Sequence, residues 1–160
     1  MTEALTRTRI AAMMGEINGV RTAFAQIPRG LQDAQLPAAV VFPGQATHDR
    51  NSMGEQLVLE TRVYKIVLYI ANASFDTSGQ GEINADPFFD DVLAKFAGSP
   101  GLELKSEGVQ QSYSVLQTEL LTDGGLQVGA YPIAGQGSPD YVQIQWDLQV
   151  QEIVQVNYSD

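Results

Sequence analysis

The sequence contains no cysteine and only one histidine, His48. Without cysteine the chain can form no disulfide, no thiolate zinc site and no cysteine nucleophile. A lone histidine, with no second histidine or cysteine, is a poor candidate for a metal ligand. A Ser–His–acid triad would have to use the same His48, and no serine lies in a nucleophile-elbow pattern. These absences argue against a zinc centre and against a catalytic triad.

Long apolar runs are also missing. No stretch approaches the length that crosses a bilayer, and residues 1–10 lack the apolar core of a signal peptide. We therefore expect a soluble protein, made in a cytoplasm, with no membrane partner. The chain has 160 residues, enough to bury a real core, and we expect one domain over residues 1–160.

Basic residues become scarce after residue 65. Residues 1–65 carry seven basic and six acidic side chains, whereas residues 66–160 carry two basic and thirteen acidic ones. The second part therefore has a net charge of −11, within a total of −10. Tight binding to a phosphate backbone needs Lys and Arg, so this part is not expected to bind nucleic acid. Two interpretations remain open: the acidic residues keep the protein soluble, or they form a surface that repels DNA.

Complete nucleotide-binding and metal-binding motifs are absent as well. The G-x-G triplets at residues 79–81 and 135–137 are followed by Asn84 and Asp140, where a dinucleotide loop needs a third glycine. One acidic group lacks the spacing of a calcium loop, and helix capping and solvation explain it. That group is Glu82, Asp86, Asp90 and Asp91. We therefore predict no catalytic, metal-binding or cofactor-binding residues, and a protein that is not an enzyme.

The clearest structural signal lies in residues 141–156, where apolar and polar side chains alternate. Successive side chains of a strand point to opposite faces, so the pattern predicts one long strand with an apolar face and a wet face. The apolar face holds Val142, Ile144, Trp146, Leu148 and Val150. The wet face holds Tyr141, Gln143, Gln145, Asp147, Gln149 and Gln151. We expect the core to be built against Trp146, the only tryptophan.

The length of this strand conflicts with the size of a compact domain. Sixteen residues of strand span roughly 50 Å, whereas a chain of this length has a radius of gyration of about 15 Å. The alternation also fails at Glu152, which would point a carboxylate into the apolar face. We therefore expect the core-forming part to end near Val150. Beyond it, the chain either bulges or continues as a C-terminal arm over residues 151–160.

Two amphipathic helices are predicted. Apolar side chains recur at helical spacing over residues 6–24, with Thr6 as the N-cap. A second helix opens with Asp86 and Pro87 as N-cap and first position, and Gly98 ends it. Its predicted buried stripe is Phe89, Val92, Leu93 and Phe96.

Further strands are predicted at residues 38–42, as a buried or edge strand, and at residues 57–71. From Ile66 onward, both the odd-numbered and the even-numbered residues of the strand at 57–71 are apolar, so we expect this part to be covered on both faces. Residues 115–121 fit either a strand or a helix, and residues 44–56 are predicted as a polar loop. The fold class is therefore α+β, a mainly antiparallel sheet with two principal helices packed on it.

A subunit interface is predicted on the closing strand and its extension. The neutral glutamines of its wet face can contact a partner without desolvating charge, and an unpaired apolar extension could add to a neighbour's sheet. The candidate interface residues are Gln143, Gln145, Gln149, Gln151, Ile153, Val154, Val156 and Tyr158. The alternative is a surface strand followed by a loose terminus.

Several stretches, taken in order, resemble a known family. They are the strand PAAVVFPG at residues 37–44, the long apolar-ended strand RVYKIVLYI at residues 62–70, the helix that opens at Asp86, and the alternating closing strand. Together with the N-terminal helix, this layout resembles the tail terminator, or tail-completion, proteins of long-tailed bacteriophages. The likeness covers most of the chain, apart from residues 106–139.

The resemblance implies a non-enzymatic structural virion protein without cofactors, located in the tail or neck. It implies a homo-oligomeric ring, a hexamer, that caps the head-proximal end of the tail tube and contacts the tube protein and the neck proteins. DNA would pass through the ring without specific binding. Two alternatives stay open: a head–tail connector of the neck, in a twelve-fold ring, and a small-molecule binding domain, which would need a concave pocket.

Overall fold

A computed structural model describes residues 3–49, 57–73, 79–102, 115–121, 125–132 and 139–155. In this part of the chain, two α-helices and one 3-10 turn accompany a seven-stranded, mainly antiparallel sheet, which confirms the predicted α+β class. The elements are α1 (Glu3–Gly15), β1 (Thr22–Phe24), η1 (Asp33–Gln35), β2 (Ala38–Phe42), β3 (Ala46–Asp49), β4 (Leu57–Asn72), α2 (Gln80–Ala97), β5 (Val115–Leu120), β6 (Gly125–Ala130) and β7 (Asp140–Gln155).

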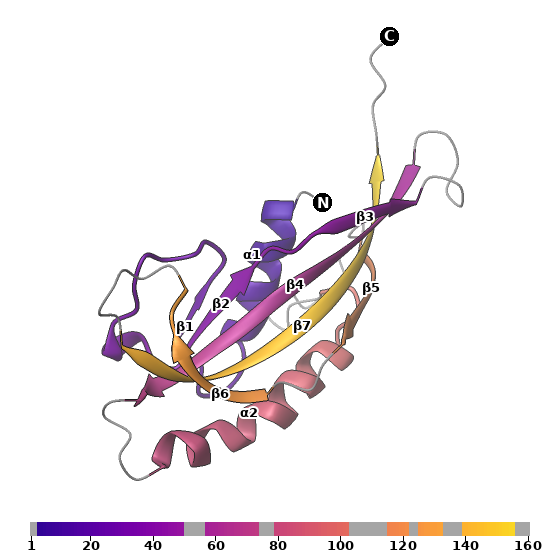
Figure 1. The fold of residues 1–160 in the computed structure, drawn as a ribbon. Helices are drawn as coiled ribbons and strands as arrows, with labels where there is room; N and C mark the ends of the chain where they lie inside the picture. Colours follow the sequence, from indigo (N-terminus) through magenta and orange to yellow (C-terminus); the bar gives the residue numbers. More distant parts are fainter. Residues whose placement is uncertain are drawn as a thin grey trace.

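The centre of the sheet is the antiparallel pair of β4 and β7, each sixteen residues long. Their register runs from Leu57 opposite Gln155 to Asn72 opposite Tyr141, with one irregularity after Tyr69. Both long strands were predicted from their alternation, and both are confirmed. Figure 1 shows one end of this β4–β7 ladder extending past the two helices.

The remaining strands build two different edges. On one side of the ladder, β2 and then β1 add to one end of β4, and β3 adds to its other end. On the opposite side, β6 and β5 pair with successive parts of β7. The β1–β2 pair is parallel, and the other described pairs are antiparallel.

Strand β3 corrects the prediction of a polar loop over residues 44–56 at residues 46–49, and residues 50–56 of that prediction lie outside the described residues. Its exposed side chains give no apolar signal, and it is a strand because it pairs with Leu59–Arg62 of β4. The prediction for residues 115–121 resolves to a strand, and the prediction for residues 38–42 is confirmed as β2, which is paired on both sides.

Helix α1 is shorter than predicted. It ends at Gly15, and Gly19 then adopts a positive φ of 96°, which takes the chain out of helical geometry. The apolar residues that continued the helical spacing belong instead to a turn and to β1. Thr6 is not an N-cap, because it lies buried inside the helix.

Helix α2 begins earlier than predicted, at Gln80, and contains Asp86 and Pro87 within it. The buried residues at its start, Gly81 and Ala85, are small, so this part of the helix shows no pattern of large apolar side chains in the sequence. The prediction that Leu93 is buried is wrong, because this side chain is 47% exposed. The buried face is Gly81, Ala85, Phe88, Val92 and Phe96.

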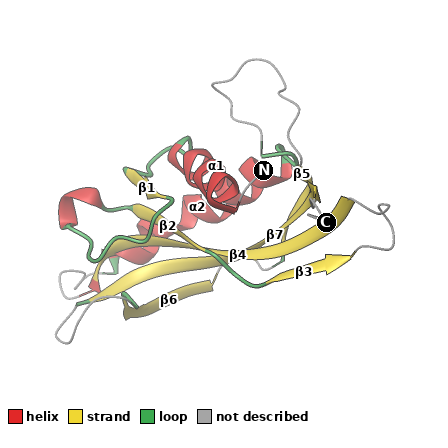
Figure 2. Cartoon of the chain, turned by 90° about the horizontal axis from the view of Figure 1, so that it is seen from above, coloured by secondary structure: helices red, strands yellow, loops and turns green. Residues whose placement is uncertain are grey.

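Both helices pack on the same face of the sheet, here called the helix face, as Figure 2 shows. Its core surrounds Trp146, which is 2% exposed and lies edge-on to Phe89 at 6.5 Å between ring centroids. The opposite face, here called the open face, has a second apolar cluster at one end only. Residues 66–70 of β4 are buried throughout, which confirms that this segment is covered on both faces.

Candidate functional site

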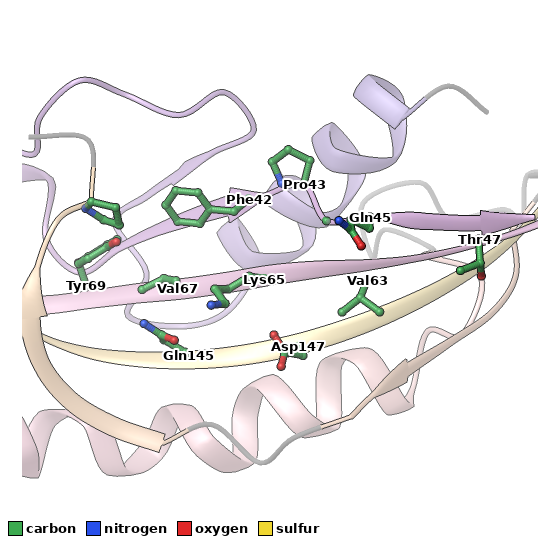
Figure 3. A pocket seen from close by; sticks show the side chains of 12 residues that line it. Phe42, Pro43, Gln45, Thr47, Val63, Lys65, Val67, Tyr69, Gln145 and Asp147 are labelled. Atoms are coloured by element: carbon green, nitrogen blue, oxygen red, sulfur yellow. The ribbon is translucent and has the colours of Figure 1, made fainter.

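The open face carries a groove of about 780 Å³, here called the open-face groove. Figure 3 shows its side chains along β4 and β7, with Pro43 and Gln45 of the connection between β2 and β3 beside them. The lining residues are Phe42, Pro43, Gly44, Gln45, Thr47, Val63, Lys65, Val67, Tyr69, Pro132, Gln145 and Asp147. A concave surface with apolar walls and a few polar groups is the usual form of a binding site.

The floor of the groove follows from the alternation of β4. Because Tyr64, Ile66 and Leu68 face the helices, the residues between them face the groove. The register places Lys65 directly opposite Asp147, so a cation and a carboxylate stand side by side on this floor. The floor therefore combines apolar area with one oppositely charged pair.

One wall of the groove depends on a glycine. Residues 43–45 cross close to β4, and a Cβ atom added at Gly44 would lie 1.8 Å from the carbonyl oxygen of Val63. Only glycine permits this approach. Arg62 fixes the crossing, because its Nη1 donates a hydrogen bond to the Gly44 carbonyl oxygen at 2.8 Å.

Three tyrosines form a cluster at one end of the groove, and Tyr69 is the one that lines it. The ring of Tyr69 lies edge-on to those of Tyr131 and Tyr141, at centroid distances of 5.4 Å and 5.6 Å. The Tyr131 hydroxyl donates to the carbonyl oxygen of Pro28, and the Tyr141 hydroxyl donates to that of Leu31 at 3.4 Å. These bonds fasten the covering segment of residues 28–31 to the sheet.

The Tyr69 hydroxyl differs from the other two, because it is buried and has no hydrogen-bond partner within the described residues. Burial raises the pKa of Tyr69, and the neighbouring Tyr131 and Tyr141 raise it further. Burial likewise raises the pKa values of Tyr131 and Tyr141. At neutral pH Tyr69 is therefore an uncharged phenol with an unused hydrogen-bond donor, placed at the end of the groove (Figure 3).

Gln143, the first of the predicted interface residues, lies inside the subunit. It is 4% exposed, and its amide nitrogen donates to the Gly129 carbonyl oxygen at 3.1 Å. Gln145 donates to the Gln143 amide oxygen at 3.3 Å. Gln143 therefore holds β6 against β7 and is not exposed for a contact between subunits. Gln145, in contrast, lines the groove.

Gln149, Gln151 and Ile153 continue the same row along β7 and are half-buried. Their backbones pair with Val63, Thr61 and Leu59 of β4. The Val154 backbone pairs with Val58. Two further candidates, Val156 and Tyr158, lie outside the described residues.

Glu152 corrects the prediction that the core ends near Val150. The carboxylate does point into the helix face, where it is 4% exposed, and the Thr6 hydroxyl donates to it at 2.5 Å. With this partner from α1, the strand continues to Gln155, which pairs with Leu57 of the same chain. Residues 151–155 therefore belong to the sheet, and an arm could begin only after them.

The charged candidates are distributed over the surface. His48 is half-exposed, and its Nε2 lies 3.2 Å from a Glu60 carboxylate oxygen, where it joins β3 to β4. The four acidic residues of α2 singled out in the sequence are exposed. Across the described ranges, no three His, Asp or Glu side chains lie close enough to hold a metal ion.

Comparison with known proteins returned no matching family model and no matching curated protein. Among the described residues, neither helix has the length and apolar character needed to cross a membrane.

Proposed function

We propose that this protein is a structural virion protein that caps the head-proximal end of a phage tail tube as a ring and joins the tail to the head. The observation that carries the proposal is the β4–β7 ladder, which extends past both helices and leaves one sheet face largely uncovered. An antiparallel sheet can leave a polar face in water, but this face also carries the apolar lining of the open-face groove, which a second layer could cover. In a ring, neighbouring subunits would supply that layer.

The order of elements supports the same proposal. The PAAV segment lies in and just before β2, the long apolar-ended segment is β4, and the closing alternating segment is β7. The resemblance to tail terminator proteins was based on these segments. The partners proposed with it are the tail tube protein on one side of the ring and neck proteins on the other.

The charge distribution suits a ring through which DNA passes without binding. The acidic residues Glu82, Asp86, Asp90 and Asp91 all lie exposed on α2. If α2 lines the lumen, these carboxylates repel the phosphate backbone. The interface is assigned in this proposal to the half-buried row of Gln145, Gln149, Gln151 and Ile153, together with Val154, Val156 and Tyr158.

The mass of the purified protein in solution tests the ring directly. Light scattering behind a sizing column, over a concentration series, should give a six-fold particle, or a monomer that becomes six-fold only with tail tubes. A twelve-fold ring would favour the neck connector instead. A strict monomer that ignores both tubes and portals would contradict every ring proposal.

A truncation that leaves β7 intact tests the role of the terminal residues. Removing residues 156–160 preserves the strand through Gln155 and the Thr6–Glu152 hydrogen bond. If Val156 and Tyr158 contribute to the interface, the truncated protein should shift toward monomer at equal concentration. An unchanged particle would restrict the interface to residues up to Val154.

One observation favours a second function, the binding of a small molecule. The open-face groove has a suitable volume, a largely apolar lining and one pair of opposite charges, Lys65 and Asp147, on its floor. A ligand that binds only the folded protein adds RT ln(1 + [L]/Kd) to the free energy of unfolding and so raises the melting temperature. A reproducible rise with one compound class, lost in the Lys65→Ala variant, would support this function over assembly.

A further inference from the structure

We propose that the open-face groove of one subunit receives strand β6 of a second copy, so that copies overlap in one direction around a ring. This inference rests on the proposed ring and names the contact that builds it. The two surfaces that meet in this contact are the open-face groove and strand β6.

Strand β6 is an unprotected sheet edge. It pairs with β7 and with no other described strand. Its apolar side chains are exposed, Leu126 by 39% and Val128 by 64%. Natural edge strands are usually blunted by charge, proline or bulges, because they otherwise pair with other chains. The sequence of β6, GLQVGA, contains no charge and no proline, so it is suited to a contact.

The faces of the sheet determine how this contact can repeat. Leu126 and Val128 stand opposite Ile144 and Val142, so they point to the helix-face side of the sheet. The groove lies on the other face, and one of its walls is the β2–β3 connection beyond the opposite side of the ladder.

The two surfaces therefore face opposite ways near opposite edges of one sheet. A second copy in a similar orientation can place the helix-face side of its β6, which carries Leu126 and Val128, against the groove of the first copy. Such a contact is heterologous, because different surfaces meet, and each copy retains one free groove and one free β6. Repeating this contact from copy to copy closes a ring when the rotation between neighbouring copies is a whole fraction of a full turn.

Electrostatics favours this pair of surfaces over others. Two copies carry −10 each and repel, so a stable contact needs surfaces of low charge. Strand β6 is uncharged, and the charges of Lys65 and Asp147 on the groove floor cancel. The apolar lining at Phe42, Pro43 and Val63, which keeps exposed area, offers burial to the exposed side chains of β6.

Cysteine crosslinking tests the contact without interference, because the natural chain has no cysteine. Val63→Cys and Val128→Cys are made as separate proteins, mixed, and treated with a short bismaleimide. The expected product is a crosslinked dimer that forms in the mixture and in neither protein alone. The matched control is Ile83→Cys, a residue on α2 that is 61% exposed, which should give no dimer with Val63→Cys.

Two crosslinking outcomes would overturn the inference. A dimer formed by Val128→Cys alone would mean that β6 pairs with β6 in a two-fold contact. A ring that persists while the mixture gives no more dimer than the Ile83→Cys control would place the interface elsewhere. A monomeric protein, even with tail tubes, would remove the proposed function together with this inference.

A charge substitution gives an independent measurement. Val128→Asp should abolish the ring at concentrations where the natural protein assembles, and Ile83→Asp, at similar exposure, should leave the ring intact. Circular dichroism and the melting temperature establish that the Val128→Asp subunit is folded. A folded Val128→Asp protein that still forms a complete ring would overturn the inference and leave the proposed function standing.

Discussion

The two faces of the sheet are built from alternate residues of the same strands, yet they differ in how they are completed. On the helix face, Ile66, Leu68 and Trp146 are covered by α1 and α2. On the open face, cover extends only over one end, by the segment of residues 24–36 and Tyr131, and the groove begins where that cover stops. One face is finished within the subunit, whereas the other retains surface for a partner.

Buried polar groups occur on both faces. On the helix face, Glu152 accepts a hydrogen bond from Thr6, whereas the hydroxyl of Thr118, which pairs with Val150, has no partner among the described residues. At the edge of the open-face cover, the Tyr69 hydroxyl also has none there. The two faces therefore differ in how they are covered and not in whether every buried hydroxyl is paired.

The largest expected effect separates the two faces by stability. Trp146→Ala removes the largest side chain of the helix-face core and should lower the free energy of unfolding by about 3–5 kcal/mol. Lys65→Ala, an exposed position on the open face, should change it by less than about 0.5 kcal/mol. Urea unfolding of both variants measures the difference. Equal losses would contradict the division into a finished and an unfinished face.

A smaller effect is expected at the contact between α1 and β7. Thr6→Val keeps the side-chain volume but removes the hydroxyl that donates to the buried Glu152, and should cost about 1–3 kcal/mol. Thr47→Val is the matched control, because Thr47 is exposed on β3. Chemical denaturation of the two proteins gives the comparison. A neutral Thr6→Val would show that this hydrogen bond does not hold the end of β7.

The tyrosines allow a comparison within the open-face cover. Tyr131→Phe loses the hydrogen bond to Pro28 and should destabilise the fold by about 1 kcal/mol. Tyr69→Phe removes an unpaired hydroxyl, so it should be neutral or slightly stabilising in the isolated subunit. Melting temperatures of the two variants test this order. A larger loss in Tyr69→Phe would mean that its hydroxyl already has a partner within the subunit.

The smallest expected effect is a change in pH dependence. Burial raises the pKa of Tyr69 in the folded protein above its ordinary value of 10.0. The unfolded chain then loses this proton first, so the stabilisation is complete below pH 10 and declines as the pH rises above it. Tyr69→Phe should therefore lose less stability than the natural protein between pH 9 and pH 11, measured by urea unfolding. If the free energy of unfolding of the two proteins fell equally over this pH range, the raised pKa of Tyr69 would be contradicted.

The sequence was most informative where a single period persisted. The alternation in residues 141–156 predicted β7, because a strand with one apolar face has a fixed parity. Residues 57–71 were predicted as β4 from their β-branched and aromatic content, since both parities are apolar from Ile66 onward. The same parity puts Val63, Lys65 and Val67 on one face, so half of the groove floor was present in the pattern. The predicted fold class followed from these strands and the two helices.

Features that depend on distant partners could not be predicted from local pattern. Glu152 resembled a strand end because its partner, Thr6, is at the other end of the chain. Strand β3 resembled a loop because pairing with β4, and not its own apolar content, makes it a strand. The groove wall depends on the close approach of Gly44 to Val63, and the covering of Tyr69 depends on Tyr131, neither of which leaves a periodic signal.

The pairing of β4 with β7 has a consequence for the order of folding. The two strands come from opposite halves of the chain, with α2 and two further strands between them. During synthesis β4 emerges long before its central partner, and contacts of large sequence separation form slowly. Strands β2 and β3 precede β4 and can pair with one of its edges, but its other edge, next to a segment that is apolar on both faces from Ile66 onward, lacks its partner for much of translation. The nascent chain passes through an aggregation-prone stage, so its yield should depend on chaperones and temperature more than the stability of the finished subunit suggests.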